Sequence, residues 1–85
     1  MSTDRTSFWA RTFAHARAHQ GWVKVGRQYT RATAAQVASD INNAHRRAAH
    51  QRVRGVAEGE RWEAFWEAAP EGPHGDFVIW IRRVH

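Results

Sequence analysis

Residues 33–54 read TAAQVASDINNAHRRAAHQRVR and carry the longest helical pattern in the chain. Their apolar residues recur at steps of three and four, which gathers them on one side of a helix. These residues are Ala34, Val37, Ala38, Ile41, Ala44, Ala48 and Ala49. Thr33 and Gln36 have the spacing of a capping box at the helix start. We therefore predict a long helix that packs through a narrow alanine-rich stripe as far as Ala49 or His50, with His45 partly buried on the same stripe.

The opposite face of this predicted helix carries amides near its start and cations near its end. Asn and Gln can pair with adenine edges, and Arg can pair with guanine edges or phosphates. Cations that precede the helix would add contacts to a nucleic-acid backbone; the alternative is an ordinary solvated face. The candidate nucleic-acid-binding residues are Lys24, Arg27, Arg31, Gln36, Asn43, Arg46, Arg47, His50 and Arg54.

The remaining patterns predict a helix and three strands. Ser7 is a reasonable N-cap for a helix to about His19, stopped by Gly21. Residues 21–25 form a short strand, which Tyr29 extends beyond a break at Gly26. Residues 61–69 fit a strand or a helix, and we favour a hairpin with residues 76–84. The predicted fold is one α+β domain of order α-β-α-β-β, with two helices packed on a three-stranded, mainly antiparallel sheet.

Composition and charge limit the other possibilities. At 85 residues the chain is one domain, 7–85, after a disordered start at 1–6. The net charge is +5, and residues 1–57 hold ten Lys or Arg against two acidic residues. The chain has no Cys, and no apolar run approaches the length of a membrane span. We expect a cytoplasmic protein with a basic surface and no membrane contact.

The last predicted strand is apolar on both sides, which suggests a second kind of surface. If both helices cover one face of the sheet, the other face displays some of Phe65, Val78 and Trp80. Trp and Arg are enriched in binding hot spots, so such a face favours a protein partner or a second copy of the chain. The alternative is that these aromatic residues merely complete a small core.

No pattern indicates catalysis. His15 and His19 have the spacing that can clamp a metal, but two solvated histidines are the favoured interpretation. We also interpret Glu58, Glu60, Glu63 and Glu67 as solvated charges. An activated group beside an orienting partner is not evident. We expect no enzyme, no metal and no cofactor.

Four stretches together resemble small basic proteins of actinobacterial phages and mobile elements. They are Gly21-Trp22-Val23, the alanine-rich helix, Arg61-Trp62-Glu63-Ala64 and Val78 to Arg82. The resemblance spans residues 21–83 through spacing, and it implies a setting without importing catalytic residues. Our first hypothesis is a nucleic-acid-binding protein, with DNA favoured because no RNP-like aromatic motif indicates RNA. The alternative is an inhibitor or adaptor that acts through the aromatic sheet face.

Overall fold

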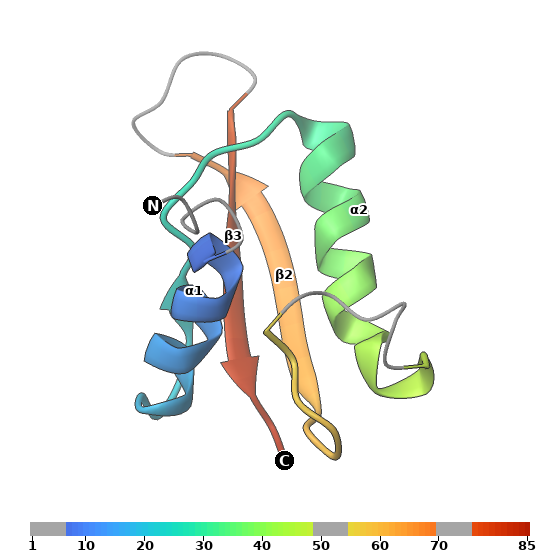
Figure 1. Cartoon of the computed structure of the whole chain (residues 1–85). Coiled ribbons are helices and arrows are strands. Elements are labelled where there is room, and N and C mark those ends of the chain that lie inside the picture. Colours follow the sequence, from blue (N-terminus) through green and yellow to red (C-terminus); the bar gives the residue numbers. More distant parts are fainter. Residues whose placement is uncertain (1–6, 49–54, 70–75) are drawn as a thin grey trace.

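The computed structural model describes residues 7–48, 55–69 and 76–85, and these form a three-stranded sheet covered by two helices (Figure 1). All pairs in the sheet are antiparallel, and the strand order is β1-β3-β2. The predicted fold class and element order are confirmed. The elements are α1 (Ser7–Arg17), β1 (Val23–Lys24), α2 (Arg31–Asn42), the 3-10 helix η2 (Ala44–Arg46), β2 (Trp62–Ala68) and β3 (Phe77–Arg83).

The predicted hairpin is confirmed, and it forms the centre of the sheet. β2 and β3 pair along their whole length, from Trp62 opposite Arg83 to Ala68 opposite Phe77. β1 adds to the other side of β3, with Lys24 opposite Trp80. The chain then rejoins β3 at Tyr29, which exchanges backbone hydrogen bonds of 2.9 and 2.8 Å with Phe77. The predicted extension of the first strand beyond Gly26 is therefore also confirmed.

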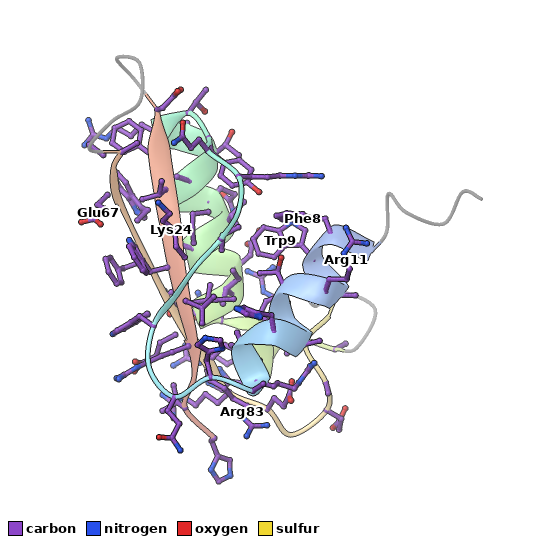
Figure 2. All side chains as sticks on the ribbon, turned by 90° about the vertical axis from the view of Figure 1, so that its left-hand side faces the viewer. Phe8, Trp9, Arg11, Lys24, Glu67 and Arg83 are labelled. Carbon is purple, nitrogen blue, oxygen red and sulfur yellow. The ribbon has the colours of Figure 1, made fainter. Side chains whose placement is uncertain are left out.

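The core lies between the helices and one face of the sheet. β2 and β3 turn alternate side chains toward the helices, as a pleated strand must. Trp62, Ile79 and Ile81 are at most 1% exposed. The Phe13 ring of α1 meets the Trp62 ring edge to face at a centroid distance of 4.6 Å. α2 packs through Ile41 and two alanines, as its stripe predicted. The two helices therefore cover the same face of the sheet (Figure 2).

The limits of α2 differ from the prediction at both ends. The N-cap is Thr30 instead of Thr33, and the Thr33 amide donates a hydrogen bond to the Thr30 hydroxyl over 3.3 Å. The α-helix ends at Asn42, so the prediction of one continuous α-helix is wrong from residue 43 to 48, where the 3-10 helix η2 forms instead at Ala44–Arg46. Asn43 is the C-cap, where both its backbone N–H and its side-chain amide donate hydrogen bonds to the Ser39 carbonyl, at 3.0 and 2.9 Å. Asn favours caps and turns over helix interiors. Residues 49–54 lie outside the described residues, as do residues 1–6.

Asn42 also ties α2 to the edge of the sheet. Its amide nitrogen donates to the Ala64 carbonyl at 2.9 Å, and its oxygen accepts from the Ala64 amide at 2.8 Å. β2 is an edge strand, and such strands present backbone groups that lack a partner strand. Asn42 satisfies two of these groups as a neighbouring strand would.

Among the described residues, no helix is long and apolar enough to cross a membrane.

The connector that leads to β2, residues 55–61, is held to α1 by a partly buried ion pair. Arg17 donates two hydrogen bonds to the Glu60 carboxylate, at 2.6 and 2.8 Å, and a third to the Gly55 carbonyl. The hydrogen bond from Arg17, aided by those from the Ala57 amide and the Trp62 indole, lowers the pKa of Glu60 to about 2. The interpretation of Glu60 as a solvated charge is therefore wrong, because its side chain is only 14% exposed.

Candidate functional site

The face of the sheet turned away from the helices has no covering layer among the described residues. Figure 2 shows Lys24 and Glu67 projecting on this side, away from Phe8 and Trp9 of α1. The strand register fixes the other members, because side chains alternate between the two faces. We call this surface the open face. It consists of Trp22, Lys24, Glu63, Phe65, Glu67, Val78, Trp80 and Arg82.

Three aromatic rings form a continuous cluster across the open face. The Trp22 ring meets the Phe65 ring edge to face, with centroids 4.8 Å apart. The Phe65 ring is stacked on that of Trp80, with centroids 6.3 Å apart and planes inclined by 12°. Trp22 and Phe65 remain 39% and 40% exposed. Phe65 and Trp80 come from the paired strands β2 and β3, and Trp22 directly precedes β1, so the sheet itself holds the cluster in place.

Charged side chains surround this cluster and fix its outer rings. The Arg82 guanidinium lies 4.8 Å from the centre of the Trp22 ring, within cation–π range. Arg82 also pairs with Glu63 on the neighbouring strand at 2.8 Å. The Trp80 indole donates a hydrogen bond to the Glu67 carboxylate at 2.8 Å. The rings are therefore pre-positioned, which lowers the entropy cost of binding through them.

The predicted protein-interaction residues divide into two groups. Phe65 and Trp80 belong to the aromatic cluster. Val78 lies on the same face but is only 2% exposed, so it offers no free apolar surface. It borders a hollow of about 440 Å³ whose other walls come from residues 24–28. Val23 is buried in the core, and its neighbour Trp22 belongs to the open face, where the sequence analysis had not placed it.

The structure does not gather the predicted nucleic-acid-binding residues on one surface. Lys24 lies on the open face, on the opposite side of the sheet from α2. The Arg27 guanidinium lies 3.9 Å from the centre of the Phe8 ring, and that of Arg31 lies 5.7 Å from the Trp66 ring. These two cations therefore contact aromatic rings on the helix side of the molecule.

The predicted base-reading residues of α2 and its C-cap form hydrogen bonds with neighbouring turns of the same helix. The Gln36 amide donates to the Asp40 carboxylate at 2.9 Å. The Asn43 amide is bound to the Ser39 carbonyl, and Arg47 lies 3.6 Å from Asp40. Arg46 follows in η2 and is exposed. His50 and Arg54 lie outside the described residues.

A second group of basic residues lies at the end of the molecule where η2 and the C-terminus meet. His45, Arg61 and His85 line one hollow of about 270 Å³, next to Arg46 in the sequence. Two carboxylates, Glu58 and Glu60, line it too. The prediction that His45 is partly buried is wrong, because η2 leaves its side chain exposed.

His15 and His19, the pair with metal-clamp spacing, are exposed, and their ring centroids lie 4.4 Å apart. Within the described part of the chain, no group of three or more His, Asp or Glu side chains is placed to hold a metal ion. Searches for known relatives found no family model, no curated protein and no solved structure that matches the chain.

Proposed function

We propose that the protein is a protein-binding module that docks its partner on the open face. The observation that supports this proposal is the cluster of exposed Trp22 and Phe65 with half-buried Trp80, on a sheet face that neither helix covers. Contiguous apolar surface of this kind on a folded domain marks an interaction site. Aromatic side chains contribute large contact areas at a low entropy cost, and they dominate the binding energy of many interfaces.

The charges on the open face favour a protein over a nucleic acid. Lys24 and Arg82 supply two positive charges, and Glu63 and Glu67 supply two negative charges beside the same rings. A nucleic-acid strand stacked on these rings would bring its phosphates close to the two carboxylates. A protein surface with mixed charges meets no such penalty, and complementary charges would set its orientation.

The test is affinity capture followed by calorimetry. The tagged full chain is used to capture proteins from cells that encode it, and any captured protein is identified and purified. We expect the double variant Trp22→Thr/Phe65→Thr to bind that partner at least about tenfold more weakly than the wild type does. Threonine suits exposed strand positions, so the variant should fold, which circular dichroism will check.

The control is Arg11→Ala, which changes an exposed cation of α1, a helix that covers the other face of the sheet (Figure 2). It should bind the partner as tightly as the wild type does. Equal affinities of the wild type and the double variant would refute the proposal, because the contact would then not involve the aromatic cluster.

Nucleic-acid binding at the end of α2 is the second candidate. It is favoured by Arg46 and by the adjoining group of His45, Arg61 and His85. The test is fluorescence anisotropy of a labelled mixed-sequence DNA duplex at about 50 and 200 mM salt, since each neutralised phosphate contributes about −0.9 to the salt slope. We expect Arg46→Ala/Arg47→Ala to weaken binding and reduce that slope. No binding at the lower salt concentration would refute this candidate.

A further inference from the structure

We propose that the partner recognised by the open face includes a second copy of this chain, in a symmetric dimer with its two-fold axis parallel to β3. This inference rests on the proposed function, because it names an occupant for the same surface. It goes further by specifying which margins of the face meet.

Two opposite charges at opposite margins of the open face support this inference. Lys24 lies on β1 at one margin, and Glu67 lies on β2 at the other, with β3 between them. Neither side chain has an ion-pair partner among the described residues. Glu63 and Arg82, by contrast, neutralise each other within the chain at 2.8 Å. Within residues 7–48, 55–69 and 76–85, the face therefore carries one positive and one negative charge without an ion-pair partner.

Symmetry brings these two charges together. A two-fold axis parallel to β3 places the β1 margin of each copy over the β2 margin of its partner. Lys24 then meets the margin that carries Glu67, and the contact occurs twice because a two-fold interface is isologous. Facing sheets pack about 10 Å apart, which a lysine and a glutamate side chain can span together. Trp80, on the central strand, would lie near the axis.

The alternative symmetric arrangement is electrostatically unfavourable. An axis perpendicular to the strands would place each β2 margin over the β2 margin of the other copy. Glu67 would then lie over the margin that carries Glu67 in the other copy, and Lys24 over the margin that carries Lys24, so neither charge would meet an opposite one. The distribution of charge on the face therefore favours the axis parallel to β3 over the perpendicular one.

The size of the face predicts a reversible dimer. β2 and β3 each have seven residues, with a rise of about 3.4 Å per residue, whereas β1 has two. Three full rows about 4.8 Å apart would give a face of about 24 by 14 Å, and the short β1 makes the actual face smaller. This is smaller than the roughly 800 Å² that each partner buries in a typical stable complex. We therefore expect an equilibrium between monomer and dimer that shifts with concentration.

Sedimentation velocity of the full chain between about 5 and 500 µM tests this inference. The weight-average mass should rise from the 9.8 kDa of the monomer toward twice that value. Lys24→Glu and Glu67→Lys should each raise the dissociation constant at least about fivefold, because each creates a like-charged contact. The combined variant Lys24→Glu/Glu67→Lys should restore it to within about twofold, since both contacts are then opposite in charge again.

This rescue separates the inference from a merely structural effect of either substitution. A monomer at all concentrations would overturn it, and so would a dimer whose stability neither charge reversal changes. The proposed function has its own readout, the capture of another protein through Phe65. A monomeric wild type that still captures a protein through Phe65 would overturn the proposed dimer but not the proposed function. A charge-dependent dimer that captures no other protein would support the proposed dimer.

Discussion

Replacing Glu60 with Gln removes the charge at the centre of the contact between α1 and the connector. In the wild type, the pKa of the Glu60 carboxyl falls from the ordinary 4.5 to about 2, chiefly through the hydrogen bond from Arg17. A shift of this size corresponds to about 3 kcal/mol of stability at neutral pH. The Arg17 side chain is 29% exposed, so water screens part of this interaction. We therefore expect Glu60→Gln to lower the free energy of unfolding by about 2 kcal/mol at pH 7.

The pH dependence of this loss follows from the direction of the pKa shift. Because the pKa of Glu60 is lower in the folded state, its contribution is complete above its unfolded pKa of 4.5. The contribution is lost as the pH falls toward the folded pKa of about 2. The difference in stability between wild type and variant should therefore be largest at neutral pH and approach zero near pH 2. Urea unfolding, followed by tryptophan fluorescence at several pH values, measures this difference.

Glu63→Gln is the matched control. Glu63 pairs with Arg82 at 2.8 Å, but both side chains are more than 40% exposed. An ion pair of this kind contributes less than about 1 kcal/mol. Equal losses in the two variants, or a loss in Glu60→Gln that does not change with pH, would refute the stabilising role assigned to the partly buried ion pair of Glu60 and Arg17.

Two further substitutions test the packing. Gly55 has φ +103°, and a Cβ there would lie 2.7 Å from Phe13 Cδ2; Gly59, at φ +84°, has no atom within 4 Å of such a Cβ. Thermal unfolding should show Gly55→Ala losing at least about 1 kcal/mol more than Gly59→Ala, and equal losses would contradict this packing. Asn42→Ala should cost about 1–3 kcal/mol by leaving the Ala64 backbone groups unpaired. A neutral Asn42→Ala in the same assay would show that the edge of β2 needs no such partner.

Local patterns in the sequence predicted the strands well. The alternation of Trp62, Ala64 and Trp66, followed by a turn-rich segment and the β-branched residues of β3, gave the hairpin within one residue at each end. An apolar residue at every second position is enough to predict such a strand, because one face of each strand packs on the helices. Helix ends were predicted less well. α1 ends at Arg17, before the predicted end near His19, and α2 is capped by Thr30 instead of Thr33, since both Thr residues fit the N-cap rule.

Long-range contacts explain what the sequence did not reveal. Asn42 pairs with a strand 22 residues away, and Arg17 pairs with Glu60 across 43 residues. No local pattern indicates such partners. The pair Asn42–Asn43 is the one local signal that the helix ends there, because Asn favours caps and turns over helix interiors. The open face followed from the apolar residues of β3, but Trp22 joined it only through the register of β1.

The indole N–H signals of the five tryptophans can report which surface makes contact. We would record nitrogen–proton correlation spectra while the concentration of the protein is raised in steps. The signals of Trp22 and Trp80 should shift together as the open face is covered, whereas that of Trp62, 1% exposed in the core, should stay in place. Shifts confined to Trp9 and Trp66, on the helix side, or no shift at any concentration, would contradict the assignment of the open face as the contact surface.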